Sequence, residues 1–182
     1  MASFQDRVMG AMRLEAATFE EIEHDRTAVS QAALVVLGAA ISGVIGTIRY
    51  GFFGGAIVAT IVFAFIGWGV GAAVVWLVGT RLMPGRNTEA DFQQVLRVVG
   101  FAQAPGLFSV LGIIPYLGWL IRFAIGIWTL IALVIAVRQA LDYDDTLKAV
   151  LVCVIAWVIM FVVMMMVGFL GFGAAMVSGG MM

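Results

Sequence analysis

Few residues in this sequence could do chemistry, and they do not form a recognisable catalytic set. Asp142, Asp144 and Asp145 resemble a cation-binding loop, but calcium requires about six to eight oxygen ligands and a supporting glycine turn. These carboxylates are better suited to capping a following helix, whose N-terminus favours negative charge. His24 has no histidine or cysteine companion, and the single Cys153 lies in an apolar segment. We therefore expect no catalytic residue, no metal site, no cofactor and no enzymatic activity.

Two polar residues inside long apolar stretches are stronger candidates. Gln103 comes two residues before Pro105, which lacks an N–H and leaves a backbone carbonyl without its helical donor. Gln103 could line a solute path, although an interhelical hydrogen bond that fixes packing is the more common role. Arg122 lies a short way inside another apolar stretch, where its long side chain can reach the nearer membrane surface.

The composition is that of an integral membrane protein. Of the 182 residues, 63% are hydrophobic and 12% are charged, and the mean hydropathy is +1.10. Soluble domains carry roughly 25% charged residues, so this chain cannot build a water-exposed surface. A net charge of -1 argues against nucleic acid as a partner. The lipid bilayer is the environment in which the chain must fold.

The apolar stretches predict an all-α, polytopic transmembrane bundle with five spans. Residues 1–25 form a separate N-terminal segment, and residues 26–182 form the membrane domain. Each apolar stretch is long enough to cross the hydrocarbon core as a helix. The expected spans are residues 28–48, 54–79, 96–114, 116–137 and 147–170. Pro105 should kink the third span, and Pro115 should form a tight turn after it.

The N-terminal segment has an apolar edge at helical spacing, formed by Phe4, Val8, Met12, Phe19 and Ile22. Two placements follow. The segment is either an amphipathic helix in the headgroup layer or a helix packed on the cytosolic ends of the spans. Thr18 and Glu21 fit a capping box, which predicts that a second helix starts at Thr18.

Small residues form two faces that allow close approach between helices in lipid. The first face contains Gly38, Ser42 and Gly46, and the second contains Gly67 and Gly71. Each face could pack against the chain's own helices or against another protein.

The basic residues predict a cytosolic N-terminus and an extracytoplasmic C-terminus. With five spans, only Arg49 and Arg122 of the ten basic residues fall outside the cytosol. The cytosolic group comprises Arg7, Arg13, Arg26, Arg81, Arg86, Arg97, Arg138 and Lys148. Such a bias is typical of the cytosolic side of membrane proteins.

Three segments resemble the YIP domain family, whose members are five-span relatives of the Ypt/Rab-interacting membrane proteins. The segments are T-E-A-D-F-Q-Q-V-L-R-V-V-G-F-A-Q-A-P, I-I-P-Y-L-G and L-K-A-V, and the resemblance covers about residues 18–170. Gly100, Phe101 and Pro105 are similar to the family's glycine-tyrosine-then-proline signature, with phenylalanine in place of tyrosine. Pro115 belongs to the second segment.

The resemblance implies a helical bundle with a cytosolic N-terminus. Eukaryotic relatives bind prenylated Rab-type GTPases and help to organise membrane traffic, so a small GTPase is a partner by family analogy alone. The chain lacks their long N-terminal region and their aspartate-leucine-tyrosine-glycine-proline motif. Its compact form resembles prokaryotic members, which implies a prokaryotic cytoplasmic membrane.

Two functional hypotheses follow. The first is a non-enzymatic scaffold or adaptor that binds a membrane protein, a cytosolic protein or a second copy of itself. The alternative is a small permease or channel in which Gln103 and the Pro105 kink line the path.

Overall fold

A computed structural model describes residues 2–47, 55–86 and 88–179 of the chain. These residues form helices, and no strand occurs among them, so the all-α prediction is confirmed. The helices are α1 (Phe4–Met12), α2 (Ala16–His24), α3 (Ala28–Thr47), α4 (Gly55–Leu77), the π-helical η2 (Val78–Leu82), α5 (Phe92–Phe101), the 3₁₀-helical η3 (Ala104–Ile113), α6 (Gly118–Ala140) and α7 (Thr146–Gly179). The expected position of Arg49 lies outside the described residues.

The five-span prediction is confirmed within the described part of the chain. The segments long and apolar enough to cross a membrane are Ala28–Thr47, Ile57–Leu82, Phe92–Ile113, Gly118–Ala140 and Thr146–Val163. The third segment joins α5 and η3 into one span. It is half buried inside the protein, whereas the other four are 22–28% buried, so it forms the centre of the bundle.

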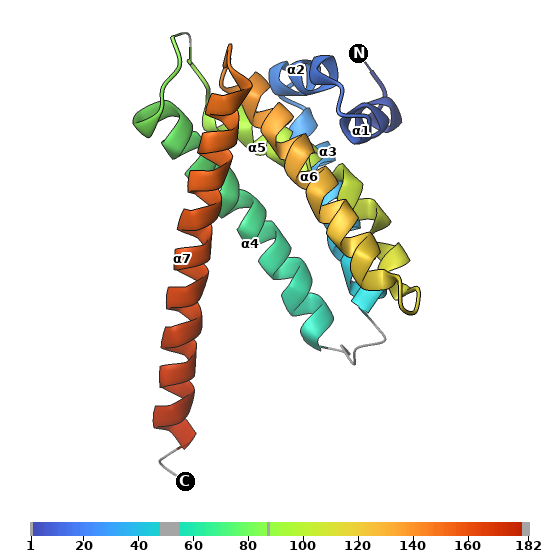
Figure 1. Ribbon diagram of the computed structural model, residues 1–182, viewed down its shortest axis with the longest axis vertical. Helices are drawn as coiled ribbons and strands as arrows, with labels where there is room; N and C mark the ends of the chain where they lie inside the picture. Colours follow the sequence, from blue (N-terminus) through green and yellow to red (C-terminus); the bar gives the residue numbers. More distant parts are fainter. Residues whose placement is uncertain (1, 48–54, 87, 180–182) are drawn as a thin grey trace.

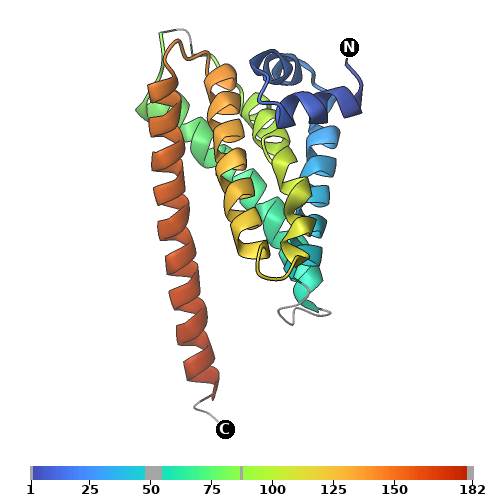
Figure 2. The same cartoon turned by 45° about the vertical axis from the view of Figure 1, so that its right-hand side comes forward.

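The helices are arranged around this central span (Figure 1). Helices α3 and α6 flank α5 and η3, while α4 crosses the bundle obliquely. Helix α7 meets α6 and α4 near its N-terminal end and diverges from them toward its C-terminal end (Figure 2). Helices α1 and α2 form a hairpin across one end of the bundle, beside the start of α5 and the end of α6.

Proline chemistry explains the change of helix type in the central span. Helix α5 ends at Phe101, and the 3₁₀ helix begins at Ala104 with Pro105 in its first turn. Because Pro105 has no N–H and its ring clashes with the carbonyl four residues earlier, a regular α-helix cannot continue there. Backbone hydrogen bonds between residues three apart replace those between residues four apart. The N–H of Gly106, for example, donates to the Gln103 carbonyl over 2.8 Å. At the position of the expected kink, the span therefore changes from an α-helix to a 3₁₀ helix.

The predicted start of α2 at Thr18 is wrong. Helix α2 begins at Ala16 after Glu15, and the Thr18 hydroxyl donates to the Glu15 carboxylate over 3.3 Å. Thr18 also packs directly on Gly10 of α1, where an added Cβ would collide with the threonine side chain. The close α1–α2 crossing therefore places Thr18 inside the first turn of the helix, and Glu21 makes other contacts described below.

Capping boxes occur instead at the starts of α1 and α5. The N–H of Asp6 donates to Ser3 Oγ over 3.2 Å, and the N–H of Ser3 donates to Asp6 Oδ2 over 3.0 Å. Asp91 precedes α5, and its N–H donates to Gln94 Oε1 over 2.6 Å. These bonds satisfy backbone donors that would otherwise be unpaired at a helix start.

Candidate functional site

The α1–α2 hairpin is packed on the ends of the spans. Phe19 and Ile22 of α2 are fully buried and belong to the main hydrophobic core. Phe4 of α1 packs edge-on against Phe101, with ring centroids 6.4 Å apart and an interplanar angle of 63°. The arrangement matches one of the two placements considered for this segment, that of a helix packed on the span ends.

Hydrogen bonds tie the hairpin to α6 as well. The indole N–H of Trp128 donates to the main-chain carbonyl of Met12 over 2.8 Å. Nearer the end of α6, Gln139 Nε2 donates to Glu20 Oε2 over 3.0 Å. The hairpin is therefore fixed to two spans. Aromatic packing holds it against α5, and hydrogen bonds hold it to α6.

A buried arginine holds the hairpin together internally. Arg7 of α1 is 1% exposed, and its Nη2 lies 3.0 Å from Glu21 Oε1 and 2.7 Å from Asp25 Oδ2. Its Nη1 donates to Gln31 Oε1 of α3 over 3.1 Å. One guanidinium thus joins α1, α2, the α2–α3 connection and the first membrane span. Removing one member of a buried ion pair leaves an uncompensated charge, so such a site constrains the local structure strongly.

The two acidic partners of Arg7 remain ionised at neutral pH. The pKa of Asp25 falls to about 2, chiefly because the Thr27 hydroxyl and N–H donate to its carboxylate, with Arg7 contributing further. The pKa of Glu21 is lowered first by the backbone N–H of Ala2 and then by Arg7. Both carboxylates therefore keep the negative charge that the buried guanidinium requires.

A second buried group connects α2 to the central span. Glu23 and Arg97 are each 4% exposed, and Arg97 Nη2 donates to the main-chain carbonyl of Glu23. The Glu23 carboxylate accepts one hydrogen bond, from Gln94 Nε2 over 3.3 Å, while its Oε2 has no partner among the described residues. The charged side chain of Glu23 is thus poorly compensated for its burial.

The electrostatic surroundings of Glu23 favour its neutral form. Burial raises the pKa of Glu23 to about 7, and the negative charges of Asp142 and Glu20 add to this effect. His24 and Arg97 act in the opposite direction without cancelling it. Glu23 therefore changes its charge near neutral pH, unlike Asp25 and Glu21.

Sequence reasoning did not single out Arg7, Glu23 or Arg97 as a site. A signal was present, because Arg7 follows Phe4 by three residues and Glu23 follows Phe19 by four. At this spacing each charge shares a helical face with the apolar edge, which places it toward the core. A charged residue on the buried face of an amphipathic helix thus indicates that its side chain has an ion-pair or hydrogen-bond partner in the core.

Gly100 lies where three spans meet. A Cβ added there would be 2.7 Å from the Ala32 Cβ of α3 and 3.0 Å from Trp68 Nε1 of α4. The Trp68 indole donates to the Leu96 carbonyl over 2.9 Å, which fixes the ring beside α5. Phe101 and Pro105, which follow Gly100, are also buried. The signature segment is therefore the packing centre of the bundle.

Pro115 lies in a tight turn between η3 and α6. The N–H of Leu117 donates to the Pro115 carbonyl over 2.7 Å, and the intervening Tyr116 has a φ of 64° and is 96% exposed. Gly118 then packs against the Gly112 backbone so closely that a side chain would collide with it. The turn lies at the end of the bundle opposite the hairpin.

The two faces of small residues have different surroundings. A Cβ at Gly38 would lie 2.7 Å from Leu107 Cδ2, and one at Gly46 would collide with the Ser109 carbonyl. Ser42, between them, is half-buried. This first face packs on η3. By contrast, a Cβ added at Gly67 or Gly71 would have no neighbour within 4 Å.

Gln103 and Arg122 lie near opposite ends of η3. Gln103 is half-buried between α5 and η3, where its side chain makes no capping hydrogen bond. Arg122 is half-buried one turn into α6, and its Cγ, Cδ and Nε would all lie 3.3 Å from a Cβ added at Gly112. The structure therefore does not bring these two polar residues into one site.

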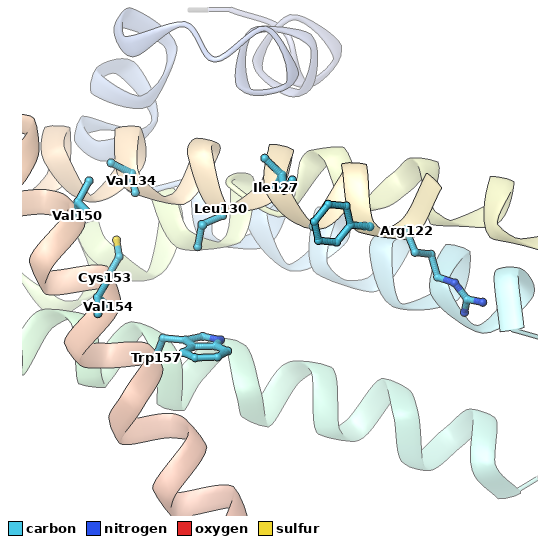
Figure 3. A pocket seen from close by; sticks show the side chains of 10 residues that line it. Arg122, Ile127, Leu130, Val134, Val150, Cys153, Val154 and Trp157 are labelled. Atoms are coloured by element: carbon cyan, nitrogen blue, oxygen red, sulfur yellow. The ribbon is translucent and has the colours of Figure 1, made fainter. Parts of the chain in front are cut away.

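A groove of about 570 Å³ lies between α6 and α7 (Figure 3). It is lined by Arg122, Phe123, Gly126, Ile127, Leu130, Val134, Val150, Cys153, Val154 and Trp157. Among these lining residues Arg122 is the charged one, and its side chain points away from the end formed by Val134 and Val150. The groove is otherwise almost entirely apolar.

The acidic loop between α6 and α7 has local partners. Asp145 Oδ1 accepts from the N–H of Leu147 at the start of α7 over 2.9 Å, and Arg138 Nε donates to the Tyr143 carbonyl over 3.2 Å. Within the described ranges, no three or more histidine, cysteine, aspartate or glutamate residues are grouped as metal ligands would be. The contacts of this loop are those of a helix terminus.

A protein-family model described as the Yip1 domain matches residues 9–167. The chain belongs to this family. Comparisons with curated proteins and with solved structures gave no match. The matched part of this Yip1 domain begins inside α1, after Arg7, and extends into α7, so it includes α2, the five membrane-spanning segments of the described chain and the buried Arg97.

Proposed function

We propose that this Yip1-domain protein is a membrane scaffold or adaptor whose contact surface is the α1–α2 hairpin. The observation that supports this proposal is that two buried arginines, Arg7 and Arg97, hold the hairpin in one orientation. A terminal helix that only lies on the membrane surface does not need such buried contacts, because it can stay solvated and mobile. A hairpin held in one orientation presents a defined surface to a partner.

The outer side of α2 supplies that surface. Ala16, Ala17, Glu20 and His24 are exposed and share one side of a short, well-anchored helix. An ordered surface binds with a smaller entropy cost than a flexible one, which suits a docking role. The partner is a membrane or cytosolic protein, and a small GTPase is one candidate by family analogy.

We place this surface in the cytosol. The basic residues Arg7, Arg13, Arg81, Arg86, Arg138 and Lys148 lie at the hairpin end of the bundle, in α1 and in the loops and helix ends beside it. Arg122 is near the opposite end. This asymmetry supports a cytosolic N-terminus and an extracytoplasmic C-terminus. A prokaryotic cytoplasmic membrane is the location that the family resemblance implies.

Cysteine accessibility tests the orientation. In a Cys153→Ala background, Arg86→Cys should react with a membrane-impermeant maleimide only after the membrane is opened. Tyr116→Cys, at the exposed turn, should react in intact cells. The reverse pattern would overturn the assignment.

Site-specific photo-crosslinking in native membranes tests the adaptor function. A crosslinking amino acid at Ala17 should give the same protein adduct in independent preparations, and one at Val158, exposed on α7, should give lipid adducts. Adding Arg7→Gln should remove the Ala17 adduct while the protein still inserts. An Ala17 position that yields no protein adduct would contradict the proposal.

The permease alternative places a solute path at Gln103 and Pro105. Ala102, Ala104 and Pro105 are buried, so the surroundings of Gln103 are closely packed. This packing supports a structural role for Gln103. Solute flux into proteoliposomes that is lost in Gln103→Leu would favour the permease instead.

A further inference from the structure

We propose that the groove between α6 and α7 binds one anionic phospholipid, from the membrane leaflet opposite the α1–α2 hairpin. Arg122 would hold the phosphate, and one acyl chain would lie along the apolar wall of the groove. This inference does not depend on the adaptor function.

The chemistry of the groove matches the two parts of a lipid. Arg122 supplies a guanidinium at one end, and the rest of the lining consists of aliphatic and aromatic side chains with Gly126 and Cys153. Guanidinium groups form strong charge-assisted hydrogen bonds with phosphate oxygens. Arg122 also interacts with other groups of the chain, and its five N–H donors let it serve several acceptors.

The position of Arg122 along α6 fits the headgroup level. Arg122 precedes Ala140, the last residue of α6, by 18 residues, which is about 27 Å along a helix axis. The hydrocarbon core is about 30 Å thick. If Ala140 lies near one surface, Arg122 therefore lies near the other, where phosphate groups are found.

The shape of the groove fits an acyl chain that enters from the bilayer. Arg122 and Val134 are 12 residues apart on α6, so the groove is about 18 Å long. It is closed near Val150 and Cys153, where α6 and α7 meet, because Cys153 is buried. Toward the other end α7 diverges, and Trp157 on its wall is 69% exposed.

Charge complementarity favours a lipid over a second copy of the chain. The sequence contains 11 acidic residues, and all of them lie in α1, α2 and the loops at the hairpin end. A second copy inserted in the same orientation would have its Asp and Glu side chains at that same end. It therefore has no acidic side chain at the level of Arg122, whereas the opposite leaflet supplies phosphates there.

Photoactivatable lipids test the proposal on the full-length protein. The purified chain is reconstituted in phosphatidylcholine nanodiscs with a trace of phosphatidylglycerol or phosphatidylcholine that carries a photoreactive acyl chain. Both lipids carry a phosphate, but the choline cation of phosphatidylcholine offsets its negative charge and weakens its attraction to Arg122. We expect phosphatidylglycerol to label α6 and α7 peptides about fivefold more than phosphatidylcholine, a preference of about 1 kcal/mol, the size of an ion pair at a hydrated interface. Arg122→Gln should remove this preference, and Arg86→Gln, which changes an exposed charge outside the groove, should preserve it.

A second variant tests the groove itself. A Cβ at Gly126 would have no neighbour within 4 Å, so Gly126→Leu should fill the groove without straining the fold. Labelling by both lipids should fall, with helix content and the size-exclusion profile unchanged. Equal labelling by the two lipids, a preference that survives Arg122→Gln, or undiminished labelling of a correctly folded Gly126→Leu protein would each overturn the proposal. Protein adducts from a crosslinker at Leu130, without lipid labelling, would overturn it in favour of a second copy.

Discussion

Arg7 Nη2 lies 2.7 Å from Asp25 Oδ2, which joins the first helix of the chain to the residues just before the first span. The same nitrogen lies 3.0 Å from Glu21 Oε1. Because α1 and α2 are each only nine residues long, neither would be stable alone in water. Their helical structure therefore depends on docking, and this buried charge is one of its main determinants.

Replacing Arg7 should release the hairpin. We expect Arg7→Gln to weaken docking by about 2–3 kcal/mol, because Asp25 and Glu21 lose their buried counter-charge. Hydrogen exchange in α1 and α2 should become faster while α3 and α6 keep their protection. Arg13→Gln is the matched control, since Arg13 is exposed and lies 3.8 Å from Glu15. Equal protection in the two variants would contradict the role of Arg7.

Hairpin docking should weaken as the pH rises toward neutrality. The pKa of Glu23 is about 7 in the folded protein, against an ordinary value of 4.5. Between these values the docked state binds more protons than the released state, so a rise in pH favours release. Above about pH 7 Glu23 is ionised in both states, and its effect is complete. Asp25 contributes no change here, because its carboxylate is ionised throughout this range.

Hydrogen exchange of α2 from about pH 4.5 to about pH 8, corrected for intrinsic amide exchange, measures this dependence. His24 also has a raised pKa, principally because its ring bonds the Glu20 carbonyl, so it contributes in the same direction. Glu23→Gln isolates the buried carboxylate and should flatten most of the profile. A profile unchanged in Glu23→Gln would assign the pH effect to His24.

Gly100 should not tolerate a larger residue. We expect Gly100→Ala to lower stability by about 1–3 kcal/mol, since the new methyl group would crowd Ala32 and Trp68. Gly67→Ala provides the control, because open space surrounds its Cβ position and alanine favours a helix more than glycine does. Thermal unfolding in detergent should separate the two variants. A Gly100→Ala protein as stable as wild type would show that the three spans can move apart without cost.

Leucine at both Gly67 and Gly71 should leave the isolated chain folded. Neither position has a neighbour within 4 Å of a Cβ, so the stability of the monomer should change by less than about 1 kcal/mol. Thermal unfolding and size-exclusion chromatography in mild detergent check this expectation. A smaller oligomer would show that this face packs on another chain, and a large loss of monomer stability would contradict the open surroundings.

Tyr143 should stabilise the junction between the α4–α5 and α6–α7 loops. Its hydroxyl lies 3.0 Å from the Gly79 carbonyl and 2.7 Å from the Met83 carbonyl, at the π-helical end of α4. Burial raises its pKa to about 12, so the phenol keeps its proton. A phenol has one proton to donate, so we expect Tyr143→Phe to cost about 1–2 kcal/mol by removing the hydrogen bond that this proton makes to one of the two carbonyls. Faster hydrogen exchange around Met83, with α3 unchanged, would support this role.

The sequence was sufficient to predict the five spans, because membrane insertion depends on apolar length. Polar residues separate most of the apolar runs, and Pro115 marks the turn between the third and the fourth. The family resemblance singled out Gly100, Phe101 and Pro105, and the fold then showed that these three residues are buried at the centre of the bundle. The start of α2 was wrong because the Thr18 capping pattern is local, whereas the contact of Thr18 with Gly10 depends on how two helices cross.

The charged cluster was harder to foresee. The sequence shows Arg7 and Arg97 as basic residues on the cytosolic side, and only folding buries Arg7 within the hairpin and Arg97 against α2. The two glycine faces illustrate the same limit. The first packs on η3 and the second faces open space, although both have the same four-residue spacing.

The length of α7 has a consequence for the membrane itself. Its 34 residues correspond to about 51 Å, against a hydrocarbon thickness of about 30 Å. Lys148, in the first turn, is the one charged residue of this helix. A helix of this length must therefore tilt, extend past the lipid or thicken the bilayer around it, each at a cost of a fraction of a kcal/mol per ångström of mismatch. A thicker bilayer reduces that mismatch, so bilayer thickness should influence the angle between α7 and its neighbours and the regions of membrane in which the protein accumulates.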